Sequence, residues 1–528
     1  MEKLSFCLLT VILCFPLFHG GVLRSSKGFG TEDGSEEWGY TTVRPKAHLF
    51  WWLYRSSYRV ENTSSPWPTV LWLQGGPGAS GVGLGNFEEI GPLDTNLKPR
   101  NSTWLQIADL LFVDNPVGTG YSFVEDAESL VKTDEESATD LTTLLKKLYN
   151  GNGRLQKSPL FVVAESYGGK FAVTLGLSVV KAIKAGELNL TLGGIALGDS
   201  WISPEDFVLS WGPLLKDVSR LDINGEEKSN SLAQVIQKQI TEGKFEDATD
   251  SWGELEDAIS INSNGVDFYN FLLDEAMDPL AVTSTESGAA AAATQSMEKM
   301  GMRGYSRYLS SGADSSNGDI GDLLNGAIKK KLKIIPKNVS WGGQSDLVFN
   351  ALKSDFMKPR INEVDELLSL GVNVTIYNGQ VDLICATKGT EAWVQKLKWK
   401  EMGEFNKIER QPIYCGSDKI TRGFVKSYKN LHFYWILNAG HFSAAQSART
   451  KPDTIQTVRH QSKKPVRKTG GRRISPQLST TNWHSARSTS EHRISLQHVN
   501  DQYGLRLSKE TSCYQAQESA TASSADSE

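Results

Sequence analysis

The sequence predicts an α/β fold, with a mostly parallel central sheet interrupted by a helical insertion. Short apolar runs rich in β-branched residues recur along the chain, bounded by Gly, Pro or Asn, as expected for buried parallel strands. Segments with helical spacing lie between several of these runs, an alternation typical of an open sheet covered by helices. From about residue 205 to 335 the sequence becomes helical, charged and loop-rich, and the strand pattern resumes at 372.

Each element has its own local signal. Residues 40–54 alternate well enough for an opening antiparallel hairpin. Residues 134–149 and 170–185 have the apolar spacing of helices and contain no Pro. The apolar runs predict strands at Thr69–Leu73, Asp109–Val113, Leu160–Ala164, Gly194–Leu197, Val372–Tyr377 and His432–Leu437.

The two ends of the chain differ from its body. Lys3 precedes an apolar run that ends near Phe18, too short for a membrane span of ~20 residues, which predicts a cleaved secretory signal. Residues 443–528 hold 13 Lys or Arg against 7 Asp or Glu in a chain of net charge −5, so the remainder carries −11. This segment is rich in Ser, Thr and Gln, which predicts disorder. The expected units are a signal peptide at 1–24, a core at 25–205, a helical cap at 206–334, the second part of the core at 335–442 and a disordered basic tail at 443–528.

Composition and spacing narrow the function classes. Collagen, coiled-coil arrays and a wholly disordered chain are excluded, because 39% of the residues are hydrophobic and 14 are Trp. No His cluster or CxxC pair has metal-ligand spacing, so we expect neither a metal nor another cofactor. After residue 20 no apolar stretch is long enough for stable membrane insertion. The basic cluster at 463–473 lacks interleaved aromatic residues, so we expect a solvated charge run and no nucleic acid.

A secretory route has consequences for the cysteines and asparagines. Cys385 and Cys415 are the two cysteines of the body, and an oxidising lumen predicts a disulfide between them. Five Asn-x-Ser/Thr sequons predict glycosylation, at Asn62, Asn101, Asn189, Asn338 and Asn373.

Ser166 is the candidate nucleophile. It follows an apolar strand and precedes a helix in the sequence Ala164-Glu-Ser166-Tyr-Gly168, a GxSxG-like pattern with Ala in the first position. A strand-to-helix elbow with small flanking residues exposes a serine at a helix N-terminus, where developing negative charge is favoured. Taken alone such a pattern is often fortuitous, and the flanking strand and helix give it weight.

The base and acid follow from position. Of the three His in the body, His48 lies on the hairpin and His432 begins a strand, whereas His441 follows a strand end, where α/β sites form. Asp382 follows the preceding strand and completes the order Ser166, Asp382, His441. Other Asp residues also satisfy this order.

The glycine-rich turn after Leu73 is the candidate oxyanion hole. Backbone amides from such a turn stabilise the anion formed during acyl transfer, which predicts Gly76 and the amide of Tyr167 as donors. The alternative is an ordinary tight loop. A phosphate cradle is excluded because no Lys follows in P-loop register.

Five ordered motifs resemble the serine carboxypeptidases, and in particular their retinoid-inducible type in animals. They are WLQGGPG at 72–78, EIGP at 89–92, FVDNPVGTGYS at 112–122, AESYGGK at 164–170, and NGQVDLIC at 378–385 together with NAGH at 438–441. The likeness spans about residues 35–442. It implies an α/β-hydrolase fold and the catalytic triad Ser166, Asp382 and His441.

The resemblance also implies how the substrate's C-terminus is held. The family binds that carboxylate with a tryptophan-loop amide and two glutamic acids, and the matching positions here are Trp72, Gln74, Glu89 and Glu165, with Gln in place of the usual Asn. Carboxyls near a third carboxylate bind it only when protons are shared, so we expect an acidic activity optimum. A solvated Glu165 would instead give an optimum near neutrality.

The chain departs from the family at two further places. Ala79 stands where many relatives have Cys, which removes one disulfide. After His441, Phe442 and Ser443 lead into the basic tail, where relatives continue with an apolar, proline-containing segment and a final helix. We hypothesise that this C-terminus derives from an alternative or out-of-frame exon and that it destabilises the enzyme or misplaces His441.

The sequence therefore predicts a secreted or lysosomal serine carboxypeptidase that acts on peptide or protein C-termini through an acyl-enzyme, as a monomer or homodimer. One alternative is an acyltransferase that uses the same triad. Another is a catalytically impaired, non-enzymatic binding form, because of the altered C-terminus.

Overall fold

The fold was analysed in a computed structural model, which describes residues 29–60, 66–274, 320–414 and 420–446. The predicted signal peptide, the sequon at Asn62, Cys415 and all but the first four residues of the predicted tail lie outside the described residues. Among the described residues, no helix is long and apolar enough to cross a membrane.

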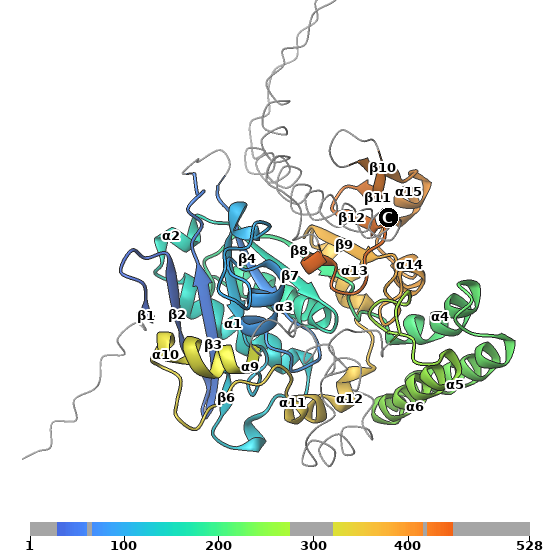
Figure 1. The fold of residues 1–528 in the computed structure, drawn as a ribbon. Helices are drawn as coiled ribbons and strands as arrows, with labels where there is room; N and C mark the ends of the chain where they lie inside the picture. Colours follow the sequence, from blue (N-terminus) through green and yellow to red (C-terminus); the bar gives the residue numbers. More distant parts are fainter. Residues whose placement is uncertain (1–28, 61–65, 275–319, 415–419, 447–528) are drawn as a thin grey trace, which may run out of the picture.

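One large sheet organises the molecule (Figure 1). Six neighbouring strands are parallel, in the order β5-β4-β7-β8-β9-β12, and antiparallel strands extend the sheet at both ends. All residues of β4, β5 and β7 are buried, as expected for parallel strands covered on both faces. The strands are β1 (Phe29–Gly30), β2 (Glu36–Arg44), β3 (Ala47–Tyr54), β4 (Thr69–Leu73), β5 (Asp109–Val113), β6 (Phe123–Val124), β7 (Leu160–Glu165), β8 (Leu192–Gly198), β9 (Val374–Gly379), β10 (Gln411–Tyr414), β11 (Thr421–Tyr428) and β12 (Leu431–Ile436).

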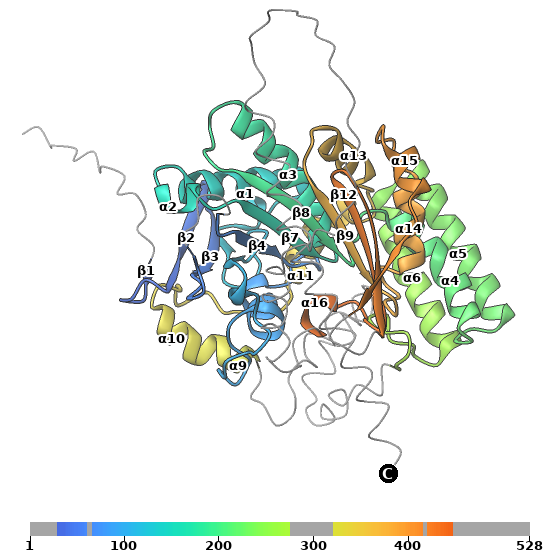
Figure 2. The same ribbon diagram turned by 90° about the horizontal axis from the view of Figure 1, so that it is seen from above.

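Some helices cover the faces of the sheet, and others lie at one end of it. Figure 2 shows α1, α3 and α13 along one face, whereas α4, α5 and α6 lie at the end of the molecule away from β1 and β2. The α-helices are α1 (Asp134–Tyr149), α2 (Gly153–Gln156), α3 (Gly168–Lys184), α4 (Pro204–Asp217), α5 (Ile223–Thr241), α6 (Phe245–Ser263), α9 (Ile320–Leu323), α10 (Lys329–Leu332), α11 (Asp346–Ala351), α12 (Lys353–Phe356), α13 (Ile361–Ser369), α14 (Thr387–Gln395), α15 (Met402–Lys407) and α16 (Ser443–Gln446). A π-helical segment, Gly81–Ile90, follows β4 and packs on β4 and β5.

The predicted α/β class and most of the predicted elements are confirmed. β4, β5 and α1 have the expected bounds, and residues 40–54 lie in the β2–β3 hairpin, whose strands are antiparallel. β9 ends two residues later than expected because Asn378 and Gly379 still pair with β12. β10 and β11 were not predicted, since six of the eight β11 residues are half-buried and show no clear alternation.

The helical insertion at 206–334 is predicted as one cap, and its described residues form two groups of helices. Helices α4, α5 and α6 pack on one another and against α14, and Trp211 donates to the Ile384 carbonyl. Residues 320–332 instead lie along β2, where Trp38 donates to the Leu332 carbonyl and Lys331 pairs with Glu36 (Figure 1). Periodicity identified the helices but carries no information about which face of the core each one covers.

The first four residues of the predicted tail are part of the fold. Residues 443–446 form the short helix α16, which packs against the Gly81–Ile90 segment. Phe442, Ser443 and Ala444 are buried. The chain therefore continues into the fold for at least four residues beyond the predicted end of the core.

Candidate active site

Ser166 sits on a strained turn between β7 and α3. Its φ is 58°, in the left-handed region that residues other than glycine rarely adopt. The turn is packed so closely that a Cβ on Gly168 would lie 2.3 Å from the Leu73 carbonyl oxygen, and one on Gly75 would lie 2.6 Å from the Ser166 Cβ. Glycine at these two positions lets the backbone bend and keeps the serine partly exposed.

The turn that follows β8 fixes the Ser166 backbone. The Ser166 amide donates to the Gly198 carbonyl at 3.1 Å, and the Trp201 amide donates to the Ser166 carbonyl at 2.9 Å. Both polar groups of the strained residue are thereby satisfied by one neighbouring segment. A strained backbone conformation persists only where neighbouring groups stabilise it, and here Gly198 and Trp201 do so through these two hydrogen bonds.

Asp382 and His441 meet at the carboxyl edge of the sheet, as the sequence predicts. Asp382 Oδ2 lies 2.9 Å from His441 Nδ1, and both side chains are fully buried. The His441 amide donates to the Tyr269 carbonyl, and the Tyr269 ring packs on the imidazole. His441 Nε2 is buried and has no hydrogen-bond partner among the described residues, so it is the nitrogen left to accept a proton.

Burial sets the protonation of this pair. It lowers the pKa of His441 to about 4 and raises the pKa of Asp382 well above its usual value. The imidazole therefore remains neutral, the form that accepts a proton, down to mildly acidic pH. Because the two groups share a hydrogen bond, they titrate as one unit.

The predicted oxyanion amides lie beside Ser166. Tyr167 is the first residue before α3, so its amide is one of the unpaired donors of a helix N-terminus. Gly76 has φ 104°, and the Cβ position of the adjacent Gly75 lies 2.9 Å from the Tyr167 nitrogen. The glycine-rich turn and the helix N-terminus thus converge on one point next to the serine.

A buried polar cluster lies at the same edge of the sheet. Trp72 Nε1 donates to Gln74 Oε1 at 2.7 Å, which orients the amide so that its nitrogen faces the two glutamates. Gln74 Nε2 donates to Glu89 at 3.0 Å and to Glu165 at 2.9 Å. All four side chains are at most 3% exposed. The structure therefore brings together Trp72, Gln74, Glu89 and Glu165 as the resemblance implies.

Burial and the proximity of the two glutamates favour their protonated forms. Burial raises the pKa of Glu89 and raises the pKa of Glu165 well above its usual value, with the negative charge of Glu89 as a further cause for Glu165. Glu89 Oε2 and Glu165 Oε2 are buried without a hydrogen-bond partner among the described residues, while Oε1 of each accepts from Gln74. Two buried carboxyls that bind one amide favour a state in which one of them carries a proton. The cluster is thus a set of proton donors at acidic pH.

A protein-family model described as serine carboxypeptidase matches residues 28–460. The chain belongs to the serine carboxypeptidase family. Serine carboxypeptidase-like 51 of Arabidopsis thaliana is 63% identical over 417 residues, covering 78% of this chain and 89% of the relative. Retinoid-inducible serine carboxypeptidase of Rattus norvegicus is 47% identical over 435 residues, covering 82% of this chain and 93% of the relative.

Among solved structures, a prohormone-processing carboxypeptidase from Saccharomyces cerevisiae is similar in fold. It matches with a TM-score of 0.59 and 19% sequence identity, over 77% of this chain and 87% of the other. The α/β-hydrolase fold expected from the motifs is confirmed by this likeness and by the family match.

The predicted disulfide of Cys385 is not formed among the described residues. Cys385 is a free, fully buried thiol that follows β9, whereas Cys415 lies outside the described residues. Tyr414, its neighbour, ends β10, which is separated from β9 by β12 and β11.

The Cys385 thiol instead faces the candidate acid and base. Asp382, Cys385 and His441 each offer a ligand atom within 4.8 Å of the others, which makes them the one group of possible metal ligands in the described part of the chain. The group coincides with the Asp382–His441 hydrogen bond, and its thiol pKa is raised well above the usual value by burial. These observations fit a structural, uncharged thiol.

The remaining predicted sites lie on the surface. Asn101, Asn189 and Asn338 are exposed, so their amides are accessible to glycosylation. Asn373 is half-buried, and its side-chain nitrogen donates to the Gly193 carbonyl at 3.3 Å.

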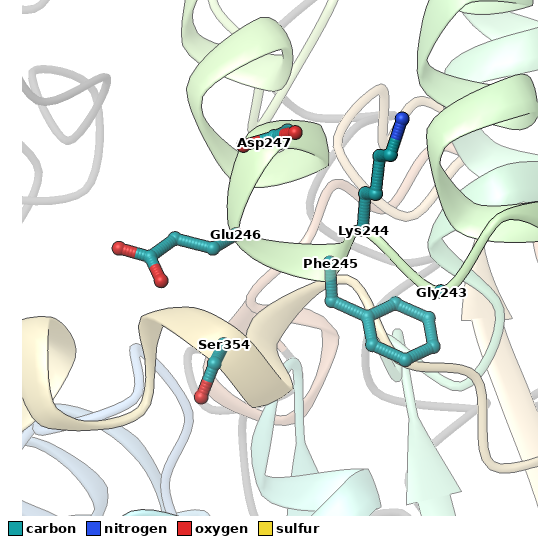
Figure 3. Close-up of a pocket in the computed structure, with 6 residues that line it drawn as sticks. All are labelled: Gly243, Lys244, Phe245, Glu246, Asp247 and Ser354. Carbon is teal, nitrogen blue, oxygen red and sulfur yellow. The ribbon is translucent and has the colours of Figure 1, made fainter.

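A separate hollow of about 300 Å³ lies where α6 begins (Figure 3). Residues from the start of α6 line it together with Ser354 from α12. None of the predicted site residues lines this hollow, so it belongs to the surface of the insertion.

Two buried residues of the site were not predicted from the sequence. Asp199 directly follows β8 and accepts hydrogen bonds from the Gly379 amide at 2.6 Å and from the Ser443 hydroxyl at 2.5 Å. The signal that identified Asp382, an acid just past a strand end, applies equally to Asp199. Ser443 carried no signal, because it was assigned to the tail.

Proposed function

We propose that this chain hydrolyses C-terminal peptide bonds through an acyl-enzyme formed on Ser166. His441 Nε2 accepts the serine proton as the hydroxyl attacks the scissile carbonyl, and then delivers it to the leaving amine. Asp382 holds the imidazole through Nδ1 and stabilises the imidazolium. The amides of Gly76 and Tyr167 donate to the oxyanion, and water then hydrolyses the ester by the same steps in reverse.

One observation carries this proposal: the paired Asp382 and His441 and the buried Gln74–Glu89–Glu165 cluster gather at one sheet edge around the Ser166 elbow. The cluster offers an amide and protonated carboxyls to the terminal carboxylate of a peptide. Such hydrogen bonds are strong when the acceptor is charged. Binding of the terminal carboxylate brings the last peptide bond to the serine, so the enzyme we propose cleaves at the C-terminus and acts as an exopeptidase.

The protonation states support activity at acidic pH. Below the raised pKa of the glutamate pair, the cluster holds the proton needed to bind a carboxylate. Above it, both glutamates are charged and repel the substrate. His441, with a pKa of about 4, remains an effective base throughout this range.

An acidic enzyme of this kind suits the lysosome or the secretory route. The apolar N-terminal segment and the exposed sequons at Asn101, Asn189 and Asn338 support passage through that route. The substrates we propose are peptides or protein C-termini, and the enzyme acts as a monomer or homodimer without a cofactor.

Labelling with a fluorophosphonate tests the nucleophile. We expect the purified chain to be labelled at pH 5 and Ser166→Ala to remain unlabelled. No labelling of a folded wild-type chain would contradict the proposal and favour the catalytically impaired form.

A pair of matched peptides tests the recognition of the carboxylate. A blocked dipeptide with a free C-terminus should be cleaved at least about 100-fold more efficiently than its C-terminal amide, because the amide leaves buried carboxyls unpaired. Equal rates would contradict a carboxypeptidase. Transfer of an activated acyl group to an added alcohol in preference to water would favour an acyltransferase.

A further inference from the structure

The turn after β8 is hydrogen-bonded to the segments that carry Ser166, Asp382 and His441. Gly198 and Trp201 bond the backbone of Ser166 from both sides. Between them, Asp199 bonds the Gly379 amide in the loop that leads to Asp382, and it bonds Ser443 two residues after His441. One four-residue turn therefore connects the nucleophile, the acid loop and the histidine loop.

Asp199 is held in this place at a conformational cost. Its φ is 41°, in the left-handed region, and its side chain is fully buried. Its amide donates to the Tyr377 carbonyl at 2.9 Å, which continues the pairing of β8 with β9. A buried acid in a strained backbone conformation lowers the stability of the fold unless neighbouring groups form hydrogen bonds with it.

Asp199 and Asp382 are buried beside the same residue: Asp199 accepts from the Gly379 amide, and the Asp382 amide donates to the Gly379 carbonyl at 3.4 Å. This brings the two carboxyls within reach of a hydrogen bond to each other. Two carboxyls form such a bond only when one of them is protonated. Asp382 has to be the carboxylate to stabilise the imidazolium of His441, so the proton belongs on Asp199.

We propose that Asp199 is a positioning residue which, in its protonated form, donates a hydrogen bond to Asp382 and so extends the triad to a fourth member. This rests on the proposed triad of Ser166, Asp382 and His441. The protonated Asp199 keeps Asp382 ionised and aimed at His441 Nδ1. When Asp199 loses its proton, two adjacent carboxylates repel, Asp382 shifts, and the histidine loses its orientation.

The charges around Asp199 agree with this assignment. Burial raises its pKa well above the usual value, the negative charge of Asp382 raises it further, and His441 and the Ser443 hydroxyl act in the opposite direction. Burial likewise raises the pKa of Asp382, whereas hydrogen bonds from the Cys385 amide and from Asp199 lower it. The other titratable groups that interact with Asp199 are Glu165 at the end of β7, Tyr377 on β9 and the Cys385 thiol.

The test is the rate of fluorophosphonate labelling of Ser166 between pH 4 and 9. The probe has no terminal carboxylate, so the glutamate cluster does not enter the measurement. In the wild type the rate should fall at the alkaline end as Asp199 ionises. Asp199→Asn is a donor at every pH, and it should move this fall upward by at least about one pH unit, roughly a tenfold gain at high pH.

Further variants separate positioning from stability. Asp199→Ala has no donor and should lower the labelling rate about 10- to 100-fold at every pH. Ser443→Ala removes a hydrogen bond that favours the ionised Asp199, so the alkaline fall should also move upward, by less than in Asp199→Asn. Asp206→Asn is the matched control, because Asp206 is a buried acid bonded to Ser203 and Lys396 and its profile should equal that of the wild type.

Thermal unfolding of each variant is measured in parallel. If Asp199→Asn folds and its alkaline fall coincides with that of the wild type, Asp199 does not supply the proton and the proposal fails. If Asp199→Asn does not fold, Ser443→Ala decides by the same comparison. Failure of the proposed triad is distinguishable, because the wild type itself would then not be labelled.

Discussion

At the scale of single residues, the glutamate pair governs how binding depends on pH. The double variant Glu89→Gln with Glu165→Gln keeps neutral donors around Gln74 but cannot lose a proton. For the wild type we expect KM of a peptide to rise about tenfold per pH unit above the pKa of the pair. This rise should be absent in the double variant, whose KM at pH 5 should lie within about tenfold of the wild type. The measurement is KM from pH 4 to 8 with one blocked dipeptide.

Gln74→Leu provides the contrast, because it removes the amide donor at every pH. We expect its KM to be raised about 10- to 100-fold with an unchanged pH dependence. A double variant whose KM still rises with pH would show that another group titrates in the binding site.

Single residues of the site were predictable where chemistry and position coincide. Ser166 and His441 stand out because few residues of their type follow a strand end, and Asp382 then follows from chain order. Asp199 was missed although it also follows a strand, since nothing in a linear sequence shows that β8 and β9 are neighbours.

At the scale of elements, a buried ionic cluster joins α1, α3 and the segment before α13. Arg360, 1% exposed, donates to Asp134 at 2.9 Å and to Asp355 at 2.7 Å. Asp134 in turn accepts from the Tyr167 hydroxyl at 2.8 Å, and Lys170 lies 3.5 Å from it. This cluster therefore anchors Tyr167, the residue that we propose as a donor to the oxyanion.

Arg360→Met should leave two buried carboxylates short of a partner. We expect a loss of about 3–5 kcal/mol in the free energy of unfolding, measured by urea denaturation. Lys46→Met is the control, because the pair of Lys46 with Asp126 is solvent-exposed and its loss should not change stability measurably. If both variants lost the same free energy of unfolding, the buried cluster would stabilise the fold no more than an exposed ion pair does.

Most elements were predictable because their signals are local. The fully buried runs of β4, β5 and β7 read as strands, and the apolar spacing of α1 reads as a helix. The described residues of the insertion are helical, as predicted, and form two groups of helices. Its partition depends on contacts such as Trp38 with Leu332, which join residues nearly 300 positions apart.

At the scale of the whole molecule, all residues of the proposed site lie within the described residues up to 446. The Asp382–His441 bond, the glutamate cluster and the contact of Ser443 with Asp199 all lie before that point, and the family match ends at residue 460. The hypothesis that the altered C-terminus misplaces His441 assumes that the chain leaves the fold at residue 443. Instead Phe442 to Ala444 are buried beside the site.

A chain that ends at His460 should therefore be labelled by the fluorophosphonate at the same rate as the full chain. Residues 461–528 hold ten Lys or Arg and six Asp or Glu, so their removal changes the formal charge from −5 to −9. The shortened enzyme should elute later from an anion-exchange column at pH 7 while its pH profile stays the same. A second chain that ends at Gln446 shows whether residues 447–460, the last part of the family match, contribute to stability. Loss of labelling in the chain ending at His460 would mean that the basic segment supports the site, and the core would then have to be drawn to include it.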